Sequence, residues 1–167
     1  MAKEKALILK TPRDIRVPVL TREQYAEIRS IRLALEGLAA ETAAGKVTAE
    51  QLQMLERNIR DNLEAVHCGD LIAALKLNQA FHFALADIAG MPLLRDMLDS
   101  LWMRTGPLIA RAYGDFSERM AVEHHWEGLR ALEKGDGTAA RQAICTDILD
   151  GNQKMMELIA RREATLA

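Results

Sequence analysis

The chain has 167 residues, a length that fits one domain with a sizeable core, or one domain with a tail. Hydrophobic residues make up 49% and charged residues 28%, a balance that excludes both an intrinsically disordered chain and a membrane-spanning one. Aromatic residues make up only 4%, which argues against a β-sandwich and against a protein that stacks single-stranded bases. The net charge of −2 excludes binding of duplex DNA by bulk charge alone. Two cysteines and no apolar run long enough for a signal peptide predict a cytoplasmic protein with reduced thiols.

The beginning of the chain differs from the rest in charge and in pattern. Met1–Leu20 carries five basic and two acidic residues, a balance of +3, so the remainder carries −5. It also holds two of the four prolines and shows no helical period. We therefore predict that residues 1–21 form a basic linker or tail and that residues 22–167 form the folded domain.

From Thr21 onward, glycines separate segments that have a helical period. Five glycines, at positions 45, 69, 90, 114 and 135, follow these segments at near-equal intervals, and glycine just past a helix end is the usual stop signal. The pattern predicts six helices, at about 22–44, 48–68, 70–89, 91–113, 116–134 and 137–164. Thr48, Asp70 and Asp115 are the predicted N-caps, and Gly106-Pro107 is predicted to kink or split the fourth helix. Because the connections are short, the predicted fold class is all-α, an antiparallel bundle of six to seven helices.

Three of these helices place a polar side chain on a face that otherwise carries core residues. Asn78 and His82 lie one turn apart on the third helix, His125 lies on the fifth and Asp147 on the last. Buried polar groups must pair or bind a metal, and a helical bundle brings such side chains together on its axis. We therefore predict a metal site from these four residues. Each one alone is more typical of a hydrogen-bonded core position, the interpretation we keep for His67 and His124.

The order of several short motifs points to a known family. The relevant stretches are Ile31-Arg32-Leu33-Ala34-Leu35-Glu36-Gly37-Leu38-Ala39-Ala40, Asn78-Gln79-Ala80-Phe81-His82, Ile88-Ala89-Gly90-Met91-Pro92-Leu93-Leu94, Glu123-His124-His125 and Ala131-Leu132-Glu133-Lys134-Gly135-Asp136. Together, over roughly residues 22–160, they resemble the FCD domain, the effector-binding half of FadR-type regulators in the GntR superfamily. The resemblance implies an all-helical domain that binds a divalent metal and a small organic-acid effector.

The resemblance also implies which residues bind the metal. The family pattern is an Asp, a His four residues later, a His on the penultimate helix and a His on the last. His82 and His125 match this pattern, whereas Asn78 stands at the Asp position and Asp147 stands at the position of the last His. The ligand set still includes one carboxylate and two imidazoles, so its formal charge is unchanged. We therefore expect a metal site with an altered ligand set that binds zinc, with nickel or manganese as the other candidates. Loss of the metal is the alternative.

Three further residues are candidates for binding the effector. Arg32 shares a helical stripe with Tyr25 and Ile28, and its guanidinium matches a carboxylate bidentately. The alternative for Arg32 is a surface pair with Glu36 at i,i+4. Thr105 and Tyr113, on either side of the expected kink, are predicted to donate neutral hydrogen bonds, with ordinary helix packing as the alternative.

The resemblance implies the ligand-sensing domain of a bacterial GntR/FadR-type transcription regulator that forms a homodimer and is not an enzyme. Nothing in Met1–Leu20 can form a winged helix-turn-helix, so DNA is expected to be bound only through a domain not present in this chain. Leu94, Met97 and Leu101 are predicted to belong either to the core or to the dimer face. Two alternatives are a metal-assisted enzyme and a metal-free helical interaction module. The enzyme would need a general base, and no inward Glu or His is left unassigned.

Overall fold

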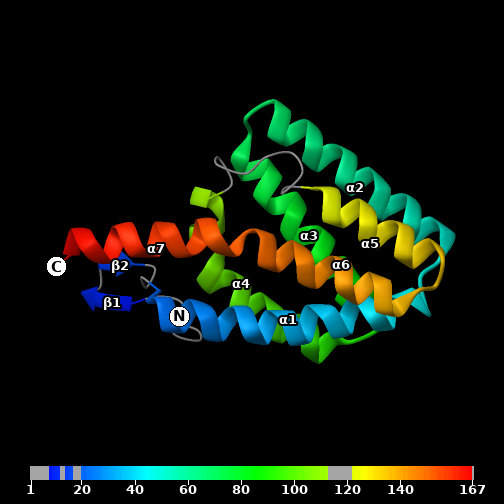
Figure 1. Cartoon of the computed structure of the whole chain (residues 1–167), viewed down its shortest axis with the longest axis horizontal. Coiled ribbons are helices and arrows are strands. Elements are labelled where there is room, and N and C mark those ends of the chain that lie inside the picture. The colour runs from blue at the N-terminus through cyan, green and yellow to red at the C-terminus, as the bar shows by residue number, and fades with distance from the viewer. Residues whose placement is uncertain (1–7, 12–13, 17–19, 113–121, 167) are drawn as a thin grey trace.

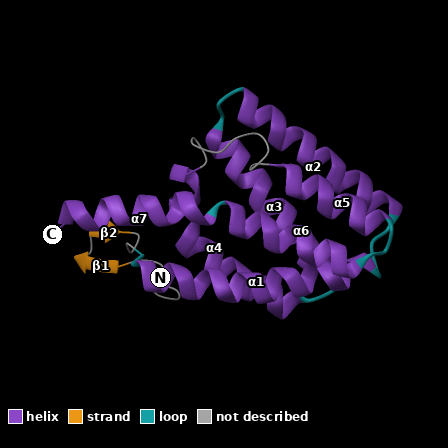
Figure 2. Cartoon of the chain, in the orientation of Figure 1, coloured by secondary structure: helices purple, strands orange, loops and turns teal. Residues whose placement is uncertain are grey.

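The computed structural model describes residues 8–11, 14–16, 20–112 and 122–166 (Figure 1). It is an all-helical domain preceded by two short strands (Figure 2). The elements are β1 (Ile8–Thr11), β2 (Asp14–Arg16), α1 (Arg22–Ala44), α2 (Ala49–His67), α3 (Leu71–Ala89), α4 (Pro92–Ala112), α5 (His124–Glu133), α6 (Gly137–Asp150) and α7 (Asn152–Leu166). The predicted all-α class is confirmed. Among the described helices, none is both long enough and apolar enough to cross a membrane.

The first helix lies along the side of the bundle and contacts α3, α4, α5, α6 and α7, most extensively α6, α3 and α4. α1 packs against α6, α3 and α4, while α2 pairs with α3 and α5 pairs with α6 (Figure 1). The approach of α1 to α6 is close because the facing residues are small: a Cβ placed on Gly37 would lie only 3.0 Å from Cys145 Sγ. This topology puts α3, α5 and α6 around one interior, with α1 and α4 beside it.

Side-chain caps and glycines define the helix ends much as predicted. Thr48 caps α2 through a capping box with Gln51, and the Asp70 carboxylate accepts a 3.0 Å hydrogen bond from the Ala73 amide at the start of α3. Gly90 ends α3 in the left-handed region, at φ 69°, where a residue with a Cβ would be strained. The predicted caps Thr48 and Asp70 are confirmed, whereas Asp115 lies outside the described residues.

Three details of the predicted helices need correction. The predicted last helix, 137–164, is two helices, α6 and α7, separated at Gly151, the residue type with the lowest helix propensity after proline. Of the two outcomes predicted at Gly106-Pro107, the split does not occur, because α4 continues through Pro107 to Ala112, and the kink stays a prediction. The fifth helix is predicted to begin at about residue 116, but α5 begins at His124, after a π-helical turn at 122–123. Residues 116–121 lie outside the described part of the chain.

The tail contains a structure that its composition does not reveal. β1 and β2 pair as an antiparallel ladder, with Ile8 opposite Arg16 and Leu9 opposite Ile15. The register shifts between Leu9 and Thr11, so the ladder is irregular as well as short. The predicted extended linker therefore includes a small two-stranded sheet, located in Figure 1 toward the same end of the molecule as the C-terminus.

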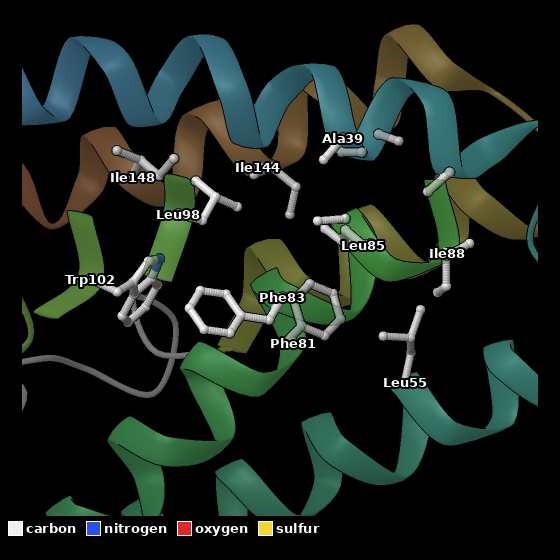
Figure 3. Packing of buried hydrophobic residues seen from close by; sticks show 14 of the residues in the cluster. Ala39, Leu55, Phe81, Phe83, Leu85, Ile88, Leu98, Trp102, Ile144 and Ile148 are labelled. Carbon is white, nitrogen blue, oxygen red and sulfur yellow. The ribbon is translucent and has the colours of Figure 1, made fainter. Parts of the chain in front are cut away.

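The core is aliphatic at one end and aromatic near its middle. Phe81, Leu85 and Leu98 are buried, and Phe83 packs edge to face on Trp102 with ring centroids 5.9 Å apart (Figure 3). Leu94, one of the residues predicted for either core or dimer face, is buried, and Leu101 packs against the core, whereas Met97 is exposed. The buried polar side chains lie in the same interior as these rings.

Removing the cap of α2 tests this account of the helix ends. We expect Thr48→Ala to lower the free energy of unfolding by about 1 kcal/mol, since the amide of Gln51 then loses its side-chain acceptor. Thr42→Ala is the matched control, because the Thr42 hydroxyl only donates to the Leu38 carbonyl inside α1. Urea denaturation measures both variants. Equal losses in the two would contradict the capping role.

Candidate metal centre

Three side chains from three helices meet in the interior. His82 of α3, His125 of α5 and Asp147 of α6 form a group that could hold a metal ion, the one group of its kind among the described residues. His82 Nε2 lies 3.3 Å from His125 Nε2 and 3.2 Å from Asp147 Oδ2, and His125 Nε2 lies 3.6 Å from Asp147 Oδ1. The imidazoles are 1% and 0% exposed and the Asp147 side chain is 10% exposed.

The spacing of these donor atoms fits a tetrahedral ion. Zinc binds imidazole nitrogen and carboxylate oxygen at about 2.0–2.1 Å, which places neighbouring ligand atoms of a tetrahedron about 3.4 Å apart. His82 Nε2 lies close to that distance from both His125 Nε2, at 3.3 Å, and Asp147 Oδ2, at 3.2 Å, whereas the 3.6 Å contact of His125 Nε2 is to the other carboxylate oxygen, Oδ1. Two imidazoles and one carboxylate are also the donor set of zinc sites that leave a fourth position open. The residues present therefore fit the ion that the sequence resemblance implies.

The two imidazoles differ in their protonation. Burial lowers the pKa of His125 to about 4, so its ring is neutral near pH 7. Burial also acts to lower the pKa of His82, but the negative charges of Glu36 and Asp147, both in close contact with the ring, outweigh it and raise that pKa to about 9. Burial acts to raise the pKa of Asp147, whereas the adjacent imidazoles of His125 and His82 lower it, so the carboxylate is ionised. Without a metal, the second proton on the His82 ring thus supplies the positive charge that a bound cation would otherwise supply.

Packing around the cluster holds the rings in place. The His125 ring stacks on Phe81, with centroids 4.1 Å apart and planes 16° from parallel. The His82 ring lies 5.5 Å from the ring of Trp102, and the Arg32 guanidinium lies 4.4 Å above the same indole. Phe81 and Trp102 belong to the core shown in Figure 3, so the donor atoms are set in a largely apolar wall.

The remaining predicted ligand and the other histidines lie around this cluster. Asn78 is buried on α3, one turn before His82, and its role as a fourth ligand stays a prediction. His124 is buried but points elsewhere: its Nδ1 lies 2.8 Å from Glu127 Oε2 and its Nε2 lies 2.7 Å from Asp150 Oδ2. His67 is exposed at the end of α2.

The predicted effector contacts have different outcomes. Arg32 is buried and forms the i,i+4 pair with Glu36, through Nε to Oε1 at 2.5 Å and Nη2 to Oε2 at 3.3 Å, so the pair exists in the interior and not on the surface. Thr105 is buried, and its hydroxyl donates to the Leu101 carbonyl at 3.1 Å. Tyr113 lies outside the described residues. The effector roles of Arg32, Thr105 and Tyr113 remain predictions.

Glu36 is the residue that the sequence interpretation missed. Its carboxylate is 1% exposed, and Oε2 lies 2.6 Å from His82 Nδ1. The expectation that no further inward carboxylate exists is therefore wrong. The signal was available: Glu36 follows Arg32 and precedes Ala40 at four-residue steps, so it shares the buried stripe of α1. Burial acts to raise the pKa of Glu36, but Arg32 and His82 lower it to about 2, so the group is an ionised partner already bound by two cations.

Comparison with known proteins identifies the fold. The FCD domain family matches residues 27–150, most of the chain. The chain belongs to the FCD domain family of GntR-type transcription regulators. The solved structure of E. coli McbR/YncC superposes with a TM-score of 0.82 at 25% identity, covering 92% of this chain and 74% of that one. The solved structure of Streptococcus agalactiae GntR shares the fold, with a TM-score of 0.61 at 22% identity. The match covers 89% of this chain and 74% of the GntR chain.

The curated relatives of this FCD domain are transcription regulators and not enzymes. The HTH-type transcriptional regulator McbR of Escherichia coli K12 is 28% identical over 131 residues, 77% of this chain and 59% of McbR. YdhC, an uncharacterized HTH-type transcriptional regulator of Bacillus subtilis 168, is 33% identical over 75% of this chain and 57% of its own length. RspR, an HTH-type transcriptional repressor of E. coli K12, is 26% identical over 80% of this chain and 60% of its own length. The chain thus spans about three fifths of the length of these relatives.

Proposed function

We propose that this FCD domain senses a small carboxylate through a zinc ion held by His82, His125 and Asp147, with Asn78 as a further ligand. The observation that carries the proposal is the convergence of two imidazole nitrogens and a carboxylate at separations of 3.2 to 3.6 Å inside the bundle. Nickel and manganese accept the same donors, and two imidazoles with one carboxylate, the donor set of zinc sites with an open position, favour zinc.

The charges around the cluster support an anionic effector. Glu36 and Arg32 offset each other, so the donor set of two neutral imidazoles and the Asp147 carboxylate carries −1. A divalent ion bound there leaves a buried charge of +1. Since an uncompensated buried charge is costly, a monoanionic oxygen ligand in the open coordination position neutralises the site. A carboxylate is such a ligand, and Arg32, Thr105 and Tyr113 are the residues we propose to contact the rest of it.

A screen with and without zinc tests this function. Acetate, succinate, citrate and related acids should raise the melting temperature of the zinc-loaded protein, and the same acids should have no effect after chelation. Proton NMR of the acids over hours should show no turnover, in keeping with a sensor. Stabilisation that persists after chelation would instead indicate a polar cavity that recognises acids without metal, and turnover would indicate an enzyme.

Asn78 offers a direct test of the retuned ligand set. Asn78→Asp should tighten zinc binding by about tenfold, because a carboxylate is a stronger ligand than a neutral amide oxygen. Gln79→Glu adds the same charge at the next residue, on the side of α3 that lines a surface pocket, and should leave the affinity unchanged. Competition with a chromophoric chelator measures both. An unchanged affinity in Asn78→Asp would remove Asn78 from the site.

We further propose that the protein is a cytoplasmic homodimer. It would contact DNA through a helix-turn-helix domain outside these residues, because a dimer presents two DNA-binding domains to the two half-sites of a two-fold symmetric operator. Leu93 and Met97, one turn apart on α4, are 68% and 47% exposed and fit a self-complementary apolar face. Light scattering should give twice the mass of one chain, and Met97→Glu should shift it toward monomer. Ile72→Glu, at an exposed position on α3, is the control. A wild-type monomer at every concentration would contradict the dimer.

A further inference from the structure

Glu36 places a charged carboxylate where the fold has no solvent to stabilise it. The side chain is 1% exposed, on the face of α1 that packs toward α3 and α6. Such a group is costly unless strong partners satisfy it. Glu36 has two: the Arg32 guanidinium binds both carboxylate oxygens, and His82 Nδ1 lies 2.6 Å from Oε2.

The two nitrogens of His82 face different surroundings. Nδ1 faces Glu36 on one side, while Nε2 faces His125 and Asp147 on the other, at 3.3 and 3.2 Å. A neutral imidazole carries its one proton on either nitrogen, and an ionised carboxylate can only accept. When His82 gives up its second proton to bind a metal, Glu36 therefore keeps the remaining proton on Nδ1, and the lone pair of Nε2 is directed into the cluster.

The second imidazole has no equivalent support in the described part of the chain. There, Nδ1 of both His82 and His125 is buried and makes no hydrogen bond, but only His82 Nδ1 lies beside a carboxylate, 2.6 Å from Glu36 Oε2. The His125 ring is held by its stack on Phe81. Only one of the two nitrogen ligands is thus oriented electrostatically. The affinity of the cluster for a cation should depend most on the contact between Glu36 and His82.

We propose that Glu36 is a positioning residue that fixes His82 for coordination, and that Arg32 holds Glu36 in the orientation this requires. The inference rests on the proposed zinc site. Arg32 is itself fixed by its position over the Trp102 ring, so α1 and α4 both contribute to the geometry of a ligand on α3. Removing the charge of Glu36 while keeping its shape should weaken metal binding without disturbing the fold.

The experiment compares Glu36→Gln with Glu41→Gln, the same change on the same helix at an exposed carboxylate paired with Arg141. Zinc affinity, measured against a chromophoric chelator, should fall about 10- to 100-fold in Glu36→Gln and stay unchanged in Glu41→Gln. The amide can donate to Nδ1 and so moves the imidazole proton onto Nε2. Circular dichroism of the metal-free variants checks that both fold.

Nitrogen-15 NMR of the imidazole rings supplies a readout that a purely structural role would not move. In the zinc-loaded wild type, His82 should carry its proton on Nδ1, and this measurement stands even if Glu36→Gln fails to fold. A proton on Nε2, or an unchanged zinc affinity in Glu36→Gln, would overturn the role of Glu36 and leave the zinc site intact. Failure of the wild type to bind zinc would overturn both.

Discussion

His125→Ala should bind no stoichiometric zinc and should lose the whole zinc-dependent rise in melting temperature. In the wild type, zinc at a hundredfold excess over its dissociation constant stabilises the fold by about 2.7 kcal/mol, because the ion binds the folded state. For a domain of this length, that free energy corresponds to roughly 5–10 °C. The substitution removes one of three donors and also the ring stacked on Phe81, so the metal-free variant is less stable as well. The quantity to compare is therefore the difference in melting temperature with and without zinc, measured for each protein separately.

His124→Ala is the matched control for this experiment. The residue is adjacent in sequence and equally well buried, but its ring nitrogens contact Glu127 and Asp150, which are about half exposed. Differential scanning fluorimetry with and without zinc should show the full zinc-dependent rise in melting temperature in His124→Ala. If this rise persists in His125→Ala, or disappears in His124→Ala, the assignment of the imidazole ligand is wrong.

The second large effect is a steep pH dependence of zinc affinity. In the metal-free protein the pKa of His82 is raised to about 9, so below that pH a proton competes with the ion for Nε2. His125 has its pKa lowered to about 4 and competes with no proton in this range, and the Asp147 carboxylate is ionised. The affinity should therefore rise about tenfold per pH unit, or about thirtyfold between pH 6.0 and 7.5.

Calorimetry in buffers of different ionisation enthalpy measures the same proton directly. Zinc binding at pH 7 should release about one proton from His82. The sign follows from the raised pKa: the proton is present before binding and leaves as the metal arrives. A flat affinity between pH 6.0 and 7.5, with no proton released, would show that His82 is already neutral and that Glu36 and Asp147 do not act on it as described.

The ends of the first four helices could be predicted because the signals are local. Thr48 and Asp70 cap their helices through backbone amides only three residues away, and Gly90 ends α3 through its own backbone angle. The convergence of His82, His125 and Asp147 could also be predicted from the sequence. The helical period assigns each residue to an inward face, and in a bundle such faces meet in few places.

What could not be predicted depends on contacts between distant segments. The four-residue steps from Arg32 to Glu36 and Ala40 indicate an inward position for Glu36, but its contact with His82 follows only from the packing of α3 onto α1. The break at Gly151 is of the same kind: glycine is tolerated within helices, and the sequence alone does not distinguish a tolerated residue from a helix end. The two-stranded sheet in the tail depends on pairing of short segments that have weak strand signals.

The most direct test of the zinc site is a crystal structure of the zinc-loaded protein with anomalous data collected on both sides of the zinc absorption edge. We expect one zinc peak per chain, about 2.0–2.1 Å from His82 Nε2, His125 Nε2 and an Asp147 oxygen, with the Asn78 amide oxygen and water or a carboxylate completing the coordination. A protein that retains no zinc after loading, or a peak held by exposed carboxylates with the His82–His125 contact unchanged, would contradict the zinc site.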